Sequence, residues 1–163
     1  MSARFRLLFI ITGVVVAFDQ ITKLYVERNF LLHESVTVIE NILDITSVRN
    51  QGAAFGILAD SSIRRPFFIT VSIAAALFIL WYIHNLEEGH DFLKIPLSLI
   101  FAGALGNLID RVRLGEVIDF IDVHWHQYHW PAFNVADSAI SIGVTILLWC
   151  LWRIERKRHL ARR

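Results

Sequence analysis

Three aspartates stand beside long apolar stretches of this chain, where a carboxylate is costly. Asp119 lies between Ile118 and Phe120 in the stretch VIDFID, Asp122 follows, and Asp137 ends the stretch FNVAD. Two carboxylates that share one proton in a low-dielectric site have divergent pKa values, so one acts as a base and one as an acid. Such a pair can activate water against a peptide carbonyl without a metal or a covalent intermediate. On the residues alone, Asp122 is a rival to Asp119.

Other catalytic chemistries have weaker support. Ser138 and Ser141 lie close to the third aspartate, but the sequence places no base beside them for a nucleophilic mechanism. The pattern HxHxxH at His124, His126 and His129 resembles a metal cluster, but this spacing is weak, and histidines are common beside interfacial Trp and Tyr. We therefore expect neither a metal nor another cofactor.

Four apolar segments must position these residues. The chain has 163 residues, is 55% hydrophobic and has a mean hydropathy of +0.51, which is too apolar for an ordinary soluble domain. A helix needs about 20 residues to cross a bilayer core of about 30 Å. A buried soluble bundle is the alternative, but four such segments in so short a chain favour a membrane protein. We predict a single domain, residues 1–163, with spans at approximately 5–25, 66–86, 94–112 and 134–153.

The N-terminal segment, the single cysteine and the net charge narrow the class of protein further. Arg4 and Arg6 precede the first span as in a signal peptide, but Ala17 is not followed by a small-x-small cleavage site, so we expect a retained span. The single cysteine, Cys150, excludes a disulfide within the chain and indicates apolar packing. A net charge of +1 gives no basic field for nucleic acid.

Basic residues at both ends predict the orientation of the chain. Arg4 and Arg6 precede the first span, and six Arg or Lys residues lie between Arg153 and Arg163. The positive-inside rule places both termini in the cytoplasm, which an even number of spans allows. The acidic link between spans two and three gives this orientation no support. Residues 27–65 and 112–133 then form the outer loops.

The two outer loops differ in pattern. The stretch SVTVIENILDITSV alternates apolar and polar residues and precedes a turn signal at Asn50-Gln51-Gly52, so it predicts a small β-sheet on the outer membrane surface. The second loop carries Trp125, Tyr128 and Trp130, which suit the membrane–water interface. We expect this second loop to lie flat on the membrane as an interfacial loop or a partly helical segment.

Polar residues on the spans indicate a single site. Ionisable residues within a membrane are costly and are functional candidates by default. Gly103 and Gly106 would let another helix approach span three closely. Each polar residue alone could be a cap, an anchor or an ion pair, and Asp19 and Lys23 are spaced to pair. Six of them nevertheless share the outer depth of the spans: Asp19, Lys23, Asp110, Arg111, Asn134 and Asp137.

Five stretches occur in this order along the chain: FDQITK (Phe18–Lys23), VRNQGAAFG (Val48–Gly56), GALGNLIDRV (Gly103–Val112), GEVIDF (Gly115–Phe120) and FNVADSAISIG (Phe133–Gly143). With these stretches the chain resembles the bacterial lipoprotein signal peptidases, or signal peptidase II. The resemblance covers nearly the whole length. It implies a four-span aspartic peptidase of the bacterial cytoplasmic membrane, with both termini inside. Such an enzyme cleaves a prolipoprotein just before a cysteine that carries diacylglycerol.

The resemblance also implies roles for individual residues. The catalytic pair is Asp119 and Asp137, near the extracytoplasmic face, and Asp122 falls outside it. Globomycin is the implied inhibitor, membrane lipids are partners, and a monomer is expected. We interpret Asn134 as orienting the water or the scissile amide, and the first outer loop as a clamp on the substrate. The implied supporting residues are Asp19, Lys23, Asn50, Gly52, Gly103, Asn107, Asp110, Arg111, Val117, Asn134 and Ala136.

Two other functions remain open from the residues alone. A small proton-coupled transporter would also use intramembrane Asp, Lys and Arg, but near the midplane and around broken helices. A non-catalytic assembly factor would use the same polar residues for helix association only. Substitution of the two aspartates by asparagine would then lower stability or partner binding without abolishing a reaction.

Overall fold

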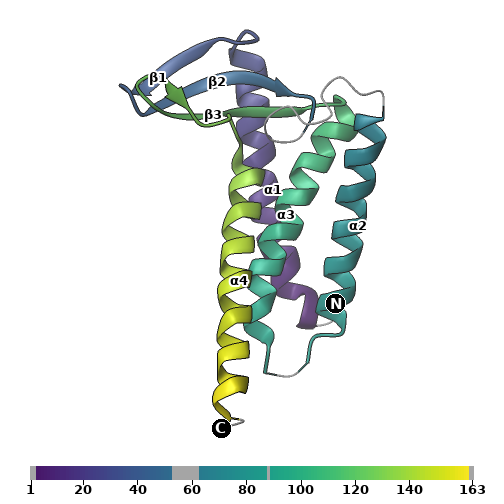
Figure 1. The fold of residues 1–163 in the computed structure, drawn as a ribbon. Coiled ribbons are helices and arrows are strands. Elements are labelled where there is room, and N and C mark those ends of the chain that lie inside the picture. Colours follow the sequence, from purple (N-terminus) through teal and green to yellow (C-terminus); the bar gives the residue numbers. More distant parts are fainter. Residues whose placement is uncertain (1–2, 53–62, 88, 162–163) are drawn as a thin grey trace.

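A computed structural model describes residues 3–52, 63–87 and 89–161, in which four long helices carry a small sheet at one end (Figure 1). Both termini lie at the opposite end of the bundle (Figure 1). The elements in chain order are α1 (Ala3–Asn29), β1 (Ser35–Ile39), β2 (Leu43–Asn50), α2 (Arg64–His84), a 3₁₀ turn η2 (Asp91–Leu93), α3 (Lys94–Arg113), β3 (Val117–Trp125), β4 (Tyr128–His129) and α4 (Val135–Ala161).

The four helices confirm the predicted membrane bundle. Each is long and apolar enough to cross a membrane. Their outward faces carry large apolar side chains, such as Ile10, Phe18, Leu77 and Leu148, which are between 58% and 61% exposed. A soluble monomer rarely exposes so much apolar surface, whereas lipid solvates it.

Helix α3 is the central element of the bundle. It packs against α1, α2 and α4, and its glycines allow the close approaches. A Cβ added at Gly103 would collide with the Ala136 carbonyl oxygen of α4, and one added at Gly106 would lie 2.7 Å from a carboxylate oxygen of Asp19 on α1. The expected close approach at Gly103 is therefore present.

The end of α3 directs the chain into the sheet. The backbone N–H of Gly115 donates to the Arg111 carbonyl at 3.1 Å, and Gly115 has a φ of 83°. Glycine adopts this left-handed conformation at little cost and commonly ends helices. Strand β3 begins two residues later, so this turn sets where Asp119 lies.

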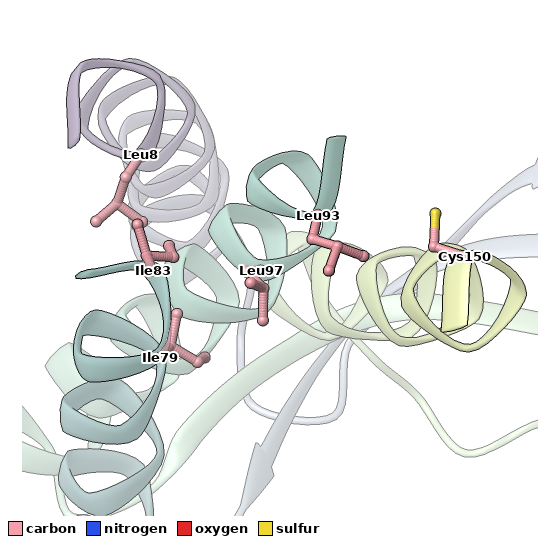
Figure 2. Close-up of a cluster of buried hydrophobic side chains, with 6 residues drawn as sticks. All are labelled: Leu8, Ile79, Ile83, Leu93, Leu97 and Cys150. Atoms are coloured by element: carbon pink, nitrogen blue, oxygen red, sulfur yellow. The ribbon is translucent and has the colours of Figure 1, made fainter. Parts of the chain in front are cut away.

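An apolar cluster holds the bundle together at the end away from the sheet (Figure 2). The cluster includes Leu8 of α1, Ile83 of α2, Leu97 of α3 and Cys150 of α4. In Figure 2 the side chains of Leu8 and Ile83 approach each other. Cys150 is buried as a packing residue, which fits the prediction for this thiol.

The sheet is antiparallel in the order β1-β2-β3-β4. The predicted sheet in the first outer loop is confirmed, but the partly helical second loop is wrong, because residues 117–125 form β3 and residues 128–129 form β4. The stretch VIDFIDVHW is rich in β-branched and aromatic residues, which pack well in strands. Register pairs Val48 with Asp119 and Asn50 with Val117, and a bulge lies between Ile45 and Val48.

Candidate active site

Polar side chains from three helices and two strands meet where the sheet joins the bundle. Helix α1 contributes Asp19 and Lys23, helix α3 contributes Asn107, Asp110 and Arg111, and the first turn of α4 contributes Asn134 and Asp137. Strand β2 contributes Asn50 and strand β3 contributes Asp119. The contacts described below join these residues into one cluster. Helix α2 contributes Phe68, whose ring lies under the Arg111 guanidinium at 4.9 Å.

Asp119 is buried and held by two side-chain amides. Its residue is 1% exposed. Asn50 Nδ2 donates to Asp119 Oδ2 at 2.9 Å, and Asn134 Nδ2 donates to Asp119 Oδ1 at 2.6 Å. Burial, and then the negative charge of Asp137, raise the pKa of Asp119 to about 7, although the two amide donors act in the opposite direction. Asp119 therefore binds a proton readily near neutrality.

Asp137 is fixed by the start of helix α4. Asn134 and Asp137 cap the helix reciprocally: the Asp137 N–H donates to Asn134 Oδ1 at 3.0 Å, and the Asn134 N–H donates to Asp137 Oδ2 at 3.3 Å. This is a capping-box arrangement, which satisfies two N–H groups that the helix leaves unpaired. Asn107 Nδ2 of α3 donates to Asp137 Oδ1 at 2.7 Å. The structural role of Asp137 as a helix cap is thus real, and it also orients the carboxylate.

Asn134 joins the two aspartates through one side chain. Its amide nitrogen donates to Asp119, and its amide oxygen accepts from the Asp137 backbone. Asn134 is fully buried. The Asp119 carboxylate accepts from the Asn134 side chain and the Asp137 carboxylate accepts from the Asn134 backbone N–H, so Asn134 fixes both carboxylates relative to each other.

Below the aspartates, Lys23 lies in a buried charge cluster. Its Nζ is 2.9 Å from Asp19 Oδ2 and 2.9 Å from Asp110 Oδ2, and the side chains of all three are 0% exposed. Lys23 Nζ also donates to Asn107 Oδ1 at 2.9 Å. The prediction that Asp19 and Lys23 pair is confirmed, and Asp110 completes the cluster.

The charge cluster anchors the backbones that carry the catalytic candidates. Asp19 Oδ1 accepts from the Ala136 N–H at 2.9 Å, next to Asp137. Asp110 Oδ2 accepts from the Ile118 N–H at 3.3 Å, next to Asp119. Charged groups of α1 and α3 therefore hold both elements of the site in place.

Gln20 belongs to this cluster although sequence reasoning did not single it out. Its Nε2 lies 3.1 Å from both Asp19 Oδ2 and Asp110 Oδ1, and 3.2 Å from the Gly106 carbonyl oxygen. The available signal was its place in the stretch FDQITK, where an amide between two charged residues interrupts an apolar run. Gln20 supplies donors to carboxylates that a single lysine cannot satisfy alone.

Arg111, Gly52 and Val117 form the side of the site nearest the sheet. Arg111 contributes a positive charge that interacts with Asp137 and Asp119. Its guanidinium lies 3.5 Å from the Gly52 carbonyl oxygen, and the Gly52 N–H donates to Asn50 Oδ1 at 3.0 Å. Val117 is 2% exposed and pairs with Asn50 across the strands. Residues 53–56 of the predicted clamp lie outside the described residues.

Asp122 and the three histidines lie away from this site. Side chains alternate along a strand, so residues three apart, such as Asp119 and Asp122, lie on opposite faces. Asp122 contacts His129 Nδ1 at 2.9 Å, and the rings of His124 and His129 stack at 4.6 Å. Within the described residues no group of three His, Cys, Asp or Glu side chains could hold a metal ion. The rival pairing through Asp122 therefore has no geometric support.

The arrangement suits hydrolysis by two carboxylates. They come from different elements, interact electrostatically and are held by amide donors, and one has a pKa near neutrality. Such a pair can hold one proton between its members at neutral pH.

Comparisons with known proteins agree on one family. The family model described as signal peptidase (SPase) II matches residues 11–153. A lipoprotein signal peptidase of Syntrophotalea carbinolica is 52% identical over 98% of both chains, and one of Geobacter metallireducens is 48% identical over 97% of this chain and 98% of its own. A bacterial membrane enzyme solved by the in meso method at 1.9 Å resolution is 41% identical, with a TM-score of 0.80 over 88% of this chain and 91% of its own. A second, solved at 2.3 Å, is 40% identical, with a TM-score of 0.78 over 90% and 87%.

Proposed function

This chain belongs to the signal peptidase II family, and we propose that it removes signal peptides from diacylglyceryl-modified prolipoproteins by a two-aspartate mechanism. The cleaved bond is the one just before the lipidated cysteine. The observation that carries the mechanism is the connection of Asp119 and Asp137 through Asn134 in a buried site.

The proposed chemistry needs only the two carboxylates and one water. The ionised carboxylate takes a proton from the water while the water oxygen attacks the scissile carbonyl carbon. The protonated carboxylate donates its proton to the carbonyl oxygen, which gives a tetrahedral intermediate. When this intermediate collapses, the C–N bond breaks, the leaving nitrogen takes the proton from the first carboxylate, and the second carboxylate regains its own. The high pKa of Asp119 makes it the favoured carrier of the resting proton, although the titration belongs to the pair.

The remaining residues of the site hold this pair in position. Asn50 and Asn134 fix Asp119, and Asn107 fixes Asp137. Asp19, Lys23 and Asp110 stabilise the adjacent backbone, as described above. Gly103 brings α3 against the Ala136 carbonyl. Arg111 supplies positive charge beside the carboxylates and connects them to Gly52 of the first outer loop, which is proposed to clamp the substrate.

The proposed orientation has the sheet on the extracytoplasmic face of the bacterial cytoplasmic membrane. The basic end of α4, with Arg153, Arg156, Lys157 and Arg158, then lies in the cytoplasm, as the positive-inside rule requires. Exposed apolar side chains of the sheet region, including Val38 and Trp125, support contact with the outer membrane surface. A monomer is part of this proposal, because the proposed mechanism needs no residue from a second copy of the chain. Globomycin is the proposed inhibitor at the same site.

A cleavage assay tests the mechanism. The full chain and its variants Asp119→Asn, Asp137→Asn and Asp122→Asn are purified in detergent and given a diacylglyceryl-modified prolipoprotein. We expect the first two substitutions to lower kcat at least 100-fold, because loss of a general acid or base costs roughly 10²–10⁴ in rate. Asp122→Asn is the matched control and retains activity, because Asp122 contacts His129 outside the site.

Two results would contradict this mechanism. Loss of wild-type activity in the presence of a metal chelator would require a metal in the reaction. Full activity of a folded Asp119→Asn or Asp137→Asn variant would exclude that carboxylate from the chemistry. Folding of each variant is checked by thermal unfolding in the same detergent.

A further inference from the structure

At the end of the bundle opposite the proposed active site, α3 and α4 enclose an apolar hollow. Its volume is about 770 Å³, which lies within the usual range of ligand sites. Ile95 and Pro96 of α3 and Ile146 and Cys150 of α4 form apolar parts of its wall. The proposed peptidase mechanism uses none of these residues.

The rim of this hollow is basic. Arg153, Lys157 and Arg158 of α4 line it, together with Trp149. The Arg153 guanidinium lies 4.9 Å over the Trp149 ring, which holds the charge at the mouth of the hollow. In the part of the chain that the structure describes, no carboxylate lines the hollow or forms an ion pair with these three cations.

Acidic side chains near this end have other partners. Glu87 lies 3.8 Å from His90, and Glu155 lies 3.2 Å from His159. Asp91 forms an ion pair with Lys94. Among the described side chains, neither Glu87 nor Glu155 forms an ion pair with Arg153, Lys157 or Arg158.

A second, smaller hollow adjoins the first. Its volume is about 330 Å³, and its lining includes Trp81 of α2 and Leu151 of α4. His90, Ile154 and Arg158 line both hollows. The smaller hollow also has polar lining residues, Tyr82, Asn85 and Glu87, whereas Leu86, Leu93 and Leu151 give it an apolar side. Arg158 thus stands where the two hollows meet, an arrangement that matches an anionic group with one apolar chain along each hollow.

The position of the rim along α4 agrees with a bound lipid. Trp149 and Trp152 precede the basic stretch of α4, and Arg156 lies over the Trp152 ring at 5.4 Å. Trp residues and then Arg and Lys residues mark the level where hydrocarbon meets lipid headgroups. The apolar walls then face the acyl chains, and the cations face the phosphates.

We propose that these two hollows bind one anionic diacyl glycerophospholipid from the leaflet at the termini end of the bundle. Its phosphate lies among Arg153, Lys157 and Arg158, and its acyl chains occupy the hollows. Basic pockets between membrane helices favour anionic headgroups. A zwitterionic lipid would bring a cationic group toward three cations, and a second copy of this chain would bring its own basic end.

Lipid binding to the purified full chain tests the proposal. Dioleoyl phosphatidylglycerol and dioleoyl phosphatidylcholine are titrated separately into protein in a non-ionic detergent, and bound lipid is counted by native mass spectrometry. We expect one tightly bound phosphatidylglycerol. The double variant Arg153→Gln/Arg158→Gln weakens it roughly 25-fold, about 5-fold for each charge removed.

Two further variants distinguish a specific lipid site from non-specific attraction by charge or by apolar surface. Arg6→Gln/Arg156→Gln removes two charges from the same end but none from the lining of either hollow, and it retains the binding. Ile95→Trp fills the larger hollow at a half-exposed position without changing charge, and it weakens the binding. Prolipoprotein cleavage persists in all of these variants, so failure of the lipid site and failure of the peptidase function are distinguishable.

Three results would overturn the proposal. Equal binding of the two lipids would indicate ordinary solvation by the bilayer. Equal loss in the two double variants would indicate bulk charge alone. Displacement of the lipid by inorganic phosphate at the same concentration would indicate a site for a soluble anion.

Discussion

At the residue scale, the site depends on Asn134 and Asp119. Asn134 donates to one aspartate and accepts from the backbone of the other, so a change there affects the pair as a unit. Asp119 carries the largest consequence for pH, because burial and the charge of Asp137 raise its pKa to about 7.

The peptidase activity should fall as the pH rises through neutrality. Above a pKa of about 7 the pair loses its shared proton, and no acid then remains to protonate the scissile carbonyl oxygen. We expect kcat/KM to drop about tenfold per pH unit beyond that point, as for loss of one essential proton. Cleavage rates measured from about pH 5 to about pH 9 check this. A rate that stays constant through neutrality would show that the protonated carboxyl is not required.

The raised pKa of Asp119 also makes the folded state less stable as the pH rises toward neutrality. The folded-state pKa of Asp119 lies above its ordinary value of 3.8, so the folded state binds the proton more tightly than the unfolded state does. The stability that this proton contributes is present below about pH 4 and is lost as the pH rises to about 7. This loss of stability is tested by measuring thermal unfolding of the wild type and of Asp119→Asn at pH values across that window and comparing the two.

Several site residues were predictable from sequence, and others were not. Asp19, Lys23, Asp110, Arg111, Asn134 and Asp137 share one depth in the spans, so their convergence follows from the orientation of the three helices that carry them. Gln20 and the contact of Asn50 with Asp119 do not follow, because they depend on side-chain rotamers and on strand register. The bulge between Ile45 and Val48 sets that register, and no local pattern marks it.

At the scale of elements, the Lys23 cluster joins α1 to α3, and through backbone N–H groups to α4 and β3. Lys23→Met should lower the free energy of unfolding by about 3–5 kcal/mol, because it leaves two buried carboxylates without their counterion. Thermal unfolding in detergent measures this effect.

Two further variants isolate the charge effect. Lys94→Met is the matched control, since Lys94 pairs with an exposed Asp91 and such pairs contribute about 0–1 kcal/mol. The triple variant Asp19→Asn/Lys23→Met/Asp110→Asn removes all three charges and should recover part of the lost stability. A triple variant less stable than Lys23→Met alone would show that packing or hydrogen bonding, and not charge, dominates.

The elements themselves were predictable to different degrees. Hydropathy over about 20 residues predicts a spanning helix because the bilayer demands internal hydrogen bonding. The alternation in residues 35–50 predicted strands for a similar local reason. Strand β3 was missed because it forms by pairing with β2, about 70 residues earlier in the chain, and its aromatic residues suit a strand and an interfacial helix equally.

At the scale of the whole molecule, the two ends of the bundle are held by different forces. Apolar packing around Leu97 dominates at the termini end (Figure 2), whereas buried charge and amide contacts dominate beneath the sheet. The proposed orientation assigns the first end to the cytoplasm and the second to the opposite face.

Cysteine labelling in intact spheroplasts tests this orientation. Glu40→Cys places a thiol in the exposed turn between β1 and β2, and Leu160→Cys places one at the exposed end of α4. We expect a membrane-impermeant maleimide to label Glu40→Cys directly and Leu160→Cys only after permeabilisation. The wild type is the blank, since its single thiol, Cys150, is buried. The reverse pattern would invert the orientation and move the proposed active site to the cytoplasmic face.

Lys23, the counterion shared by Asp19 and Asp110, also has a consequence for the insertion of the helices into the membrane. Asp19 and Lys23 lie together on α1 as an oppositely charged pair, whereas the buried ion pair of Asp110 is made with Lys23 of another helix. An unpaired carboxylate is expensive in hydrocarbon. Synthesis proceeds from the N-terminus, so the ammonium that receives Asp110 is already in the membrane when α3 leaves the translocon. We therefore expect Asp110 to find its counterion on a helix that is inserted before its own.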